Sequence, residues 1–410
     1  MLEYELSRFL ISLVLILFFS LSIGHIFSIL SLPRVIGEIC AGLILGPTLL
    51  GYMVPDLYEW LFSGFPEQQK MLSVFYWLGL IFLMFTAGFK ISTSFSRQDL
   101  KLVAMLILGG LVLPFIFGLL ATSLFKNTMS ANTIAFALVI ACASAVTSIP
   151  VLTRIFVDLN MLAGRFAQIV LGAAAIQDMI LWVILSVALS IQMGQGDNPT
   201  VFSDIAPVVL GMMIFAIIAL FIVPAFLPMA GRLVLKGSPD ASLIGYTLLV
   251  CLILVSLASM LNVNIVFSAL FAGLAIGRLH GERFKIVKDN ITNIAMWFFV
   301  PIYFAMVGLQ MNLPSNFDPI LIFGFLLASS FVKVASVTFA ARFSDIPWPR
   351  AFDFGVTMNT RGGPGIVLAS LAYAAHIIDQ ELFVAFVLAS IFTALIAGVW
   401  LKLRRNSLIS

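Results

Sequence analysis

Long apolar runs, separated by charged or Pro/Gly-rich breaks, repeat along the whole sequence. Each run is roughly 17 residues or longer, which is the length that a helix needs to cross the hydrocarbon core of a bilayer. The pattern therefore predicts thirteen transmembrane helices. Their approximate spans are 9–30, 33–54, 71–90, 101–125, 131–158, 163–193, 204–235, 241–260, 263–279, 290–313, 319–341, 350–376 and 380–403.

Composition agrees with an all-α polytopic membrane protein. Of the 410 residues, 61% are hydrophobic and 10% are charged, whereas soluble proteins carry about 25% charged residues. This balance excludes a soluble protein and gives no reason to expect a nucleic-acid partner. We expect one transmembrane domain over residues 1–410, with a retained first helix and no soluble regulatory domain. The three cysteines lie far apart in apolar runs, which favours packing roles over a metal site or a disulfide.

The distribution of Lys and Arg predicts the orientation of the chain in the membrane. If thirteen helices cross, seventeen basic residues fall on the side that holds the C-terminus, and three fall on the other side. Cytoplasmic loops of membrane proteins carry an excess of Lys and Arg. We therefore expect a multi-pass protein of the cell (inner) membrane, with its N-terminus outside and its C-terminus in the cytoplasm.

Once the other charges are assigned to loops and helix ends, four ionisable residues are expected at membrane depth: Glu38, Asp178, Lys333 and Arg361. Such groups are costly at membrane depth and usually mark a transport pathway or a partner. Asp178 is the one charged residue in the range 166–196. We expect Glu38 and Arg361 to form a structural ion pair, and Arg34, one turn from Glu38, is the alternative partner.

Two predicted helices are interrupted at matching places. The segment 141–152 holds Pro150, which removes a backbone N–H and obstructs the carbonyl group four residues earlier. The segment 358–367 holds three glycines and a proline, which do not form a regular α-helix. These are the fifth helices of two six-helix halves with opposite topology. Interrupted helices in inverted repeats are typical of secondary transporters with a binding site near the bilayer midplane. Two unrelated proline kinks are the alternative.

Several motifs resemble the monovalent cation:proton antiporter superfamily, in particular its branch of bacterial sodium/proton and potassium-efflux antiporters. They are the Gln177–Asp178 pair, Thr-Ser-Ile-Pro (147–150), Lys333 in Phe-Val-Lys-Val-Ala-Ser, and the segments 299–310 and 34–47. The resemblance implies thirteen helices, a homodimer and elevator-like alternating access. It also implies a scaffold for dimerisation, about 1–95 and 204–315, and a mobile core, about 100–195 and 319–405. A Gly-x-x-x-Gly step at Gly42 and Gly46 permits close packing, either at a dimer contact or within the chain.

The sequence departs from the family pattern in ways that bear on mechanism. Electrogenic members carry two adjacent acids at the site, and Gln177 takes the place of the first. Lys90 stands where the family often has an acid, and Arg361-Gly-Gly-Pro replaces the commoner Arg-Gly-Glu. We expect no C-terminal nucleotide-binding domain like that of potassium-efflux members. One titrating carboxylate per site predicts electroneutral exchange of one proton for one monovalent cation.

Asp178 is the expected transport carboxylate, which holds either a proton or an alkali cation, because an empty ionised carboxylate is too costly to move through a dry barrier. Gln177 offers an amide oxygen, either to the cation or to the helix that holds Lys333. Thr147 and Ser148 are candidate hydroxyl ligands, with hydrogen bonds to their own helix as the alternative. Lys333 either offsets the negative C-terminal ends of the half-helices or is uncharged part of the time because it is buried.

The sequence thus favours an antiporter of Na⁺ or K⁺ for H⁺ over an enzyme, and we expect neither a catalytic residue set nor a cofactor besides the transported ions. A cation channel or uniporter is one alternative, and it would need a continuous polar lining. A sodium-coupled organic-solute carrier of similar architecture is another, and it would call for more polar groups along the crossing helices than the sequence contains.

Overall fold

The computed structural model shows an all-helical chain in the part that it describes. The described residues are 3–30, 32–90, 99–123, 132–161, 164–193, 210–211, 213–225, 240–261, 263, 265–279 and 281–409. Within these ranges, nine helical segments are long and apolar enough to cross a membrane. They are α1 (Glu3–Ile29); α2 (Arg34–Leu45) with α3 (Leu50–Met53); α5 (Gln68–Lys90); α6 (Leu100–Ile107), η1 (Leu108–Val112) and α7 (Leu113–Ala121); α10 (Arg165–Met193); α13 (Asp240–Met260); α15 (Glu282–Ile294), η4 (Ala295–Phe299) and α16 (Val300–Leu309); α18 (Pro319–Arg342); and α21 (Gln380–Ile409).

The other predicted spans hold shorter helices. The spans 131–158 and 350–376 are each divided in two by a break, and 263–279 contains α14 (Ile265–Gly277). Span 204–235 is described only in part, and that part includes a π-helical turn, η3 (Ile218–Ile222). The polytopic all-α fold is therefore confirmed for the described residues, whereas the count of thirteen crossings and the inverted repeats stay predictions.

Helix α15 corrects one predicted boundary. The sequence placed the start of this span at residue 290, after a charged segment, but the helix already begins at Glu282. Val287 and Ile291 are buried one turn apart, while Lys285 and Asp289 are exposed. An amphipathic helix can carry these charges because they lie on one face. A short helix, α4 (Pro55–Phe62), was not predicted either; it begins at a proline, which suits a first helical position.

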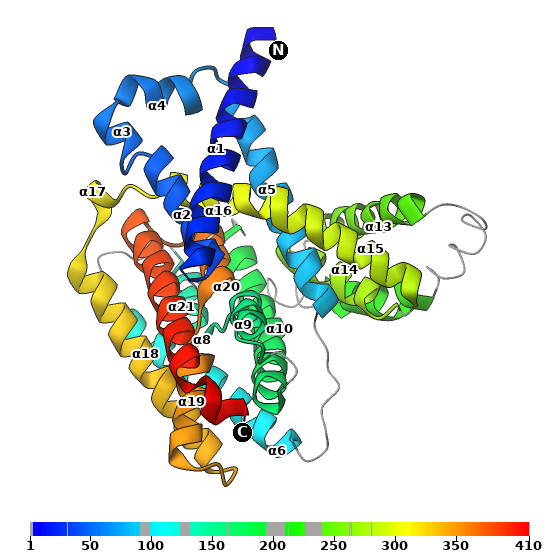
Figure 1. The fold of residues 1–410 in the computed structure, drawn as a ribbon, viewed down its shortest axis with the longest axis vertical. Coiled ribbons are helices and arrows are strands. Elements are labelled where there is room, and N and C mark those ends of the chain that lie inside the picture. Colours follow the sequence, from blue (N-terminus) through cyan, green and yellow to red (C-terminus); the bar gives the residue numbers. More distant parts are fainter. Residues whose placement is uncertain are drawn as a thin grey trace. The chain divides into compact units, whose positions relative to one another are not determined.

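The chain divides into two compact units, of which unit 1 comprises Met1–Leu21, Leu50–Ile91 and Gly196–Met306. In this unit α5 packs along α14, next to α13 and α15 (Figure 1). A Cβ atom at Gly88 would lie 2.5 Å from the carbonyl oxygen of Leu270. The backbones of α5 and α14 therefore approach closely only because this residue is glycine.

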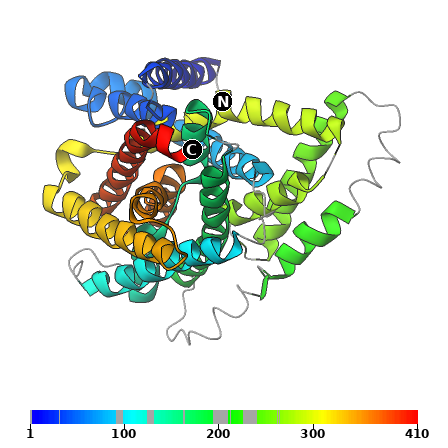
Figure 2. The same ribbon diagram turned by 60° about the horizontal axis from the view of Figure 1, so that its bottom comes forward.

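Unit 2 comprises Ser22–Leu49, Ser92–Gln195 and Val307–Ser410, and it contains every candidate site residue that the sequence singled out. Helix α18 contacts α19 (Trp348–Met358) and α21, and α20 (Gly362–Ala374) contacts α21. Figure 2 shows the orange α19 and α20 enclosed between the amber α18 and the red α21. The assignment of a scaffold and a mobile core to parts of the chain stays a prediction.

The Gly-x-x-x-Gly step serves packing inside unit 2. A Cβ atom at Gly46 would lie 3.1 Å from the Cα atom of Leu309, and a Cβ atom at Gly308 would lie 2.9 Å from the Cα atom of Gly42. Small residues on both elements thus bring α2 against the end of α16. Of the two interpretations of this step, the structure supports contact within the chain.

Candidate ion-binding site

Both predicted breaks are present, and each divides a helix into two half-helices. Helix α8 (Thr133–Ala145) ends before a non-helical segment, 146–148, and α9 (Ile149–Asp158) begins after it. Helices α19 and α20 are separated by residues 359–361. Pro150 is the second residue of α9, where a missing N–H costs no hydrogen bond. Gly362 has a φ of +42°, which favours glycine at the start of α20.

The two breaks contact each other directly. The backbone N–H of Ser148 donates to the carbonyl oxygen of Thr360 at 2.6 Å. The hydroxyl group of Thr147 lies 3.0 Å from the carbonyl oxygen of Met358. A Cβ atom at Gly362 would lie only 2.7 Å from the Ser148 hydroxyl oxygen. Backbone groups that the breaks release from helical hydrogen bonding are thus partly satisfied across the crossing.

Lys333 lies at the C-terminal end of the half-helix α8. Its Nζ atom donates to the carbonyl oxygens of Ala145 and Val146, each at 2.6 Å, and to the hydroxyl oxygen of Thr147 at 2.8 Å. The side chain is fully buried. An ammonium group has three N–H donors, and here all three have acceptors. A positive charge at this position faces the negative end of the α8 helix dipole, and the charge-compensating role of Lys333 stays a prediction.

Gln177 connects α10 to the first break and to α6. Its Oε1 atom lies 3.0 Å from the Thr147 hydroxyl group, and its Nε2 atom donates to the carbonyl oxygen of Leu106 at 2.9 Å. Because the Thr147 hydroxyl group has one proton, it donates either to Gln177 or to Met358 while it accepts from Lys333.

A π-helical turn, η1, lies beside this amide group. In the π-helical register, the carbonyl group of Gly109 would pair with the N–H five residues later, at position 114. Pro114 has no N–H, and the Gly109 oxygen instead accepts from the hydroxyl group of Ser336 at 2.6 Å. A Cβ atom at Gly110 would lie 2.5 Å from Nε2 of Gln177. The irregular turn and its glycines therefore make room for the side chains of α10 and α18, as π-turns often do at functional sites.

Asp178 follows Gln177 on α10 and is 4% exposed. Its Oδ1 atom is buried and accepts no hydrogen bond from any described residue. Lys333 is the basic group that interacts electrostatically with its carboxylate. A buried carboxylate oxygen without a donor is costly unless a proton or a cation occupies it. Asp178 is thus a buried acid near Lys333, with one carboxylate oxygen that no described residue satisfies.

The expected ion pair between Glu38 and Arg361 does not form, which corrects the sequence prediction. Glu38 instead accepts from Nε of Arg34 at 2.9 Å, one turn away on α2. Arg361 lies at the second break, donates to the hydroxyl group of Ser329 at 2.6 Å and stacks over the ring of Phe325, 5.1 Å from its centroid. A local pair within one helix needs no second element to be ordered, which favours it over the distant pair.

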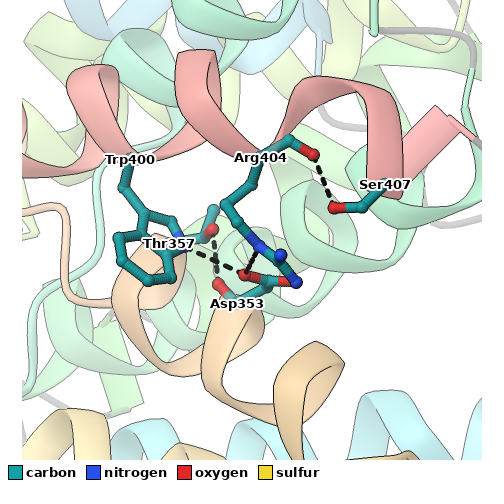
Figure 3. A network of polar contacts seen from close by, with 5 residues as sticks. All are labelled: Asp353, Thr357, Trp400, Arg404 and Ser407. Carbon is teal, nitrogen blue, oxygen red and sulfur yellow. Dashed lines mark hydrogen bonds and ion pairs between the residues drawn. The ribbon is translucent and has the colours of Figure 1, made fainter.

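Sequence reasoning missed one buried acid, Asp353 in α19. Its carboxylate accepts from Nε and Nη2 of Arg404 at 3.0 and 3.1 Å, and from Nε1 of Trp400 at 3.0 Å (Figure 3). The carboxylate therefore ties α19 to the last turns of α21. The signal in the sequence was an acid inside the predicted span 350–376 together with the basic residues that follow Trp400.

Two interrupted helices that cross beside a buried carboxylate, a buried lysine and hydroxyl groups are the architecture of broken-helix secondary transporters. The family model of the sodium/hydrogen exchanger transmembrane region matches residues 13–403, and the chain belongs to this family. This membership confirms the resemblance to the monovalent cation:proton antiporters.

Named relatives cover nearly the whole chain. It is 27% identical over 401 residues to the Na(+)/H(+) antiporter NhaS4 of Synechocystis, which covers 95% of each protein. It is 27% identical over 405 residues to cation/H(+) antiporter 18 of Arabidopsis thaliana, and 29% identical over 411 residues to K(+)/H(+) antiporter 1 of Saccharomyces cerevisiae. The chain spans about half the length of these plant and yeast relatives, 48% and 46% respectively.

A solved structure has the same fold. The sodium proton antiporter MjNhaP1 of Methanocaldococcus jannaschii superimposes with a TM-score of 0.67 at 16% sequence identity, and the match covers 99% of this chain and 98% of that protein. At this level of identity the likeness shows the fold alone.

Proposed function

We propose that this protein is a secondary active antiporter that exchanges a monovalent cation, Na⁺ or K⁺, for H⁺ by alternating access, with Asp178 binding either passenger. The observation that carries the proposal is the buried Oδ1 atom of Asp178, which has no donor among the described residues, while the preceding residue Gln177 contacts Thr147 of the first break. Membership of the sodium/hydrogen exchanger family supports the same activity.

Mutual exclusion at one carboxylate provides the coupling. A protonated Asp178 is neutral and needs no cation, whereas an ionised Asp178 needs a positive partner in these apolar surroundings. The site is therefore stable with either passenger and unstable with neither. Movement between the two sides is favoured only for the occupied states, which links cation flux in one direction to proton flux in the other.

Lys333 supports electroneutral exchange. All three of its N–H donors are bound to oxygen atoms at the end of α8, so loss of one proton would leave one of these buried oxygen atoms without a donor. We infer that Lys333 stays charged through the cycle and that Asp178 alone titrates. One proton then exchanges for one monovalent cation.

The two candidate hydroxyl ligands, Thr147 and Ser148, differ in how many protein groups already contact their oxygen atoms. The Thr147 oxygen already contacts Lys333, Gln177 and Met358. Among the described residues, the Ser148 hydroxyl oxygen accepts one long hydrogen bond, from the N–H of Val151 at 3.4 Å. We therefore place Ser148 ahead of Thr147 as a cation ligand, with Gln177 holding Thr147 in position.

Assembly and orientation are part of the proposal. The family resemblance supports a homodimer in the cell membrane. The excess of Lys and Arg on the C-terminal side supports an N-terminus outside and a C-terminus in the cytoplasm.

Proton release from liposomes tests the activity. Purified full-length protein is reconstituted with a pH-sensitive dye inside, and Na⁺, Li⁺ or K⁺ is added separately outside. The proposal expects a cation-driven change of internal pH that continues when the membrane potential is clamped at zero. A cation flux without any proton flux would instead indicate a channel or uniporter, and a steep voltage dependence of turnover would contradict electroneutral exchange.

A further inference from the structure

A groove of about 950 Å³ opens on unit 2 between α18, α19 and α21. Its lining is almost entirely apolar, and the large side chains in it are exposed: Leu327, Phe331, Phe339, Trp348, Phe352 and Ile396. A volume of this size is in the range of roughly 300–1,000 Å³ that small-molecule sites occupy. The groove is thus large enough for a ligand and is open at the surface.

The helices that form the groove favour a lipid acyl chain as its ligand. Helices α18 and α21 are both long and apolar enough to span a membrane. Along α18 the lining runs from Leu326 to Phe339, which corresponds to about 20 Å at about 1.5 Å per helical residue. One leaflet contributes about 15 Å to the hydrocarbon core. The groove is therefore long enough to hold the part of one lipid tail that lies in a leaflet.

One part of the groove's lining carries groups that can bind a lipid headgroup. Trp348, Trp400 and Arg404 line it, and tryptophan is the residue that favours the headgroup level of a bilayer. Arg404 uses Nε and Nη2 on Asp353 (Figure 3). A guanidinium group has five N–H donors, so three remain for a phosphate group.

Charge at this end of unit 2 favours an anionic headgroup. Besides Arg404, exposed basic residues stand at the ends of all three helices: Arg342, Arg350, Lys402 and Arg405. The acids of the same segments are Asp345 and Asp353, which pair with Lys101 and Arg404. The excess of positive charge is complementary to a phosphate group that carries no compensating ammonium group.

We propose that unit 2 binds an anionic phospholipid, with one acyl chain in the groove and the phosphate group at Arg404. The lining of the groove also includes Asn359, the first residue of the break between α19 and α20. The tail of the lipid thus lies against the break that carries Thr360, the partner of Ser148. This site is separate from Asp178 and does not depend on the proposed transport activity.

Photoreactive lipid tests the proposal on the full chain. The protein is reconstituted in phosphatidylcholine with a small amount of phosphatidylglycerol that carries a diazirine in its acyl chain, and crosslinks are mapped by peptide mass spectrometry. We expect crosslinks concentrated on the lining of α18, α19 and α21, and competition by unlabelled phosphatidylglycerol but not by phosphatidylcholine. Crosslinks spread evenly over the membrane-facing helices, or equal competition by both lipids, would overturn the proposal.

Variants test the two halves of the site separately. Ala335→Trp fills the groove and should greatly reduce labelling, whereas Leu403→Trp, on an exposed position of α21 outside the lining, should not. The double variant D353N/R404Q removes the guanidinium group without leaving a buried charge, and it should abolish the preference for phosphatidylglycerol. An unchanged preference would overturn the headgroup assignment. Crosslinks from the lining to a second copy of the chain, without lipid labelling, would show that a protein surface covers the groove.

Discussion

The ammonium group of Lys333 and the carbonyl group of Ala145 are joined by a 2.6 Å hydrogen bond, although 188 residues separate them in the chain. The bond places a positive charge at the end of the half-helix α8, where carbonyl groups lack helical partners. It also fixes α18 to the first break. This contact gives Lys333 a structural role that needs no second acid at the site.

Removal of the Lys333 charge should therefore lower stability first and transport as a consequence. Lys333→Met leaves the carbonyl groups of Ala145 and Val146 without donors, and each buried unsatisfied group costs about 1–3 kcal/mol. Thermal unfolding of the purified protein should show a clearly lower Tm. Lys402→Met, at an exposed position of α21, is the matched control and should leave the Tm unchanged. An unchanged Tm in the Lys333 variant would argue against the capping role.

Gly110 should be essential for the position of Gln177. In Gly110→Ala the new Cβ atom would lie 2.5 Å from Nε2 of Gln177, so the amide group must move away from Leu106 and Thr147. We expect a strong loss of exchange rate in liposomes. Gly324→Ala is the matched control, because nothing lies within 4 Å of its Cβ position. It should transport normally and gain up to about 1 kcal/mol from helix propensity. Equal activities of the two variants would contradict the positioning role.

The carboxylate of Asp353 should hold the end of α21 against α19. Asp353→Asn keeps an acceptor for Trp400 but removes the charge that pairs with Arg404. We expect a lower Tm and faster amide hydrogen exchange in the last turns of α21, because a buried partner of an ion pair is lost. Arg405→Gln, beside the pair but exposed, should change neither quantity. Unchanged protection of α21 in the Asp353 variant would show that the ion pair does not fasten this end.

Proton and cation should compete at Asp178, and the direction of the effect follows from the charge. Below the pH at which the carboxyl group is half protonated, each further fall of one pH unit should raise the apparent KM for the cation by up to about tenfold. The reason is that the carboxyl group must lose its proton before the cation binds. The maximal rate at saturating cation should change much less over the same range. Exchange measured over a series of pH values and cation concentrations checks this. A maximal rate that falls with pH at constant KM would place the titrating group elsewhere.

The positions of the breaks could be predicted from the sequence because their causes are local. Pro150 lies in the first turn of α9, and the glycines at 362, 363 and 365 lie in the first turn of α20, so each group marks the place where the second half-helix begins. The hydrogen bond from Ser148 to Thr360 could not be predicted in the same way, since it depends on how two distant half-helices cross. The count of basic residues left inside the predicted helices singled out Lys333, but its acceptors became visible only in the structure.

Electrostatic partners were the least predictable part of the site. Glu38 pairs with Arg34 and not with Arg361, because Arg34 is already one turn away on the same helix. Arg361 is satisfied in part by a hydroxyl group and an aromatic ring, neither of which has a charge pattern that a sequence reveals. The burial of Asp353 could not be predicted because this residue lies near the start of α19, and acids are common near the start of helices.

Cation-induced proton release tests the central role of Asp178 most directly. Purified protein in weakly buffered detergent solution is titrated with Na⁺, Li⁺ or K⁺, and bound cation and released proton are both measured. The wild type should release one proton for each cation bound, and Asp178→Asn should neither bind the cation nor release a proton. If the asparagine variant still binds the cation and releases protons as the wild type does, the carboxylate of Asp178 is not the shared site.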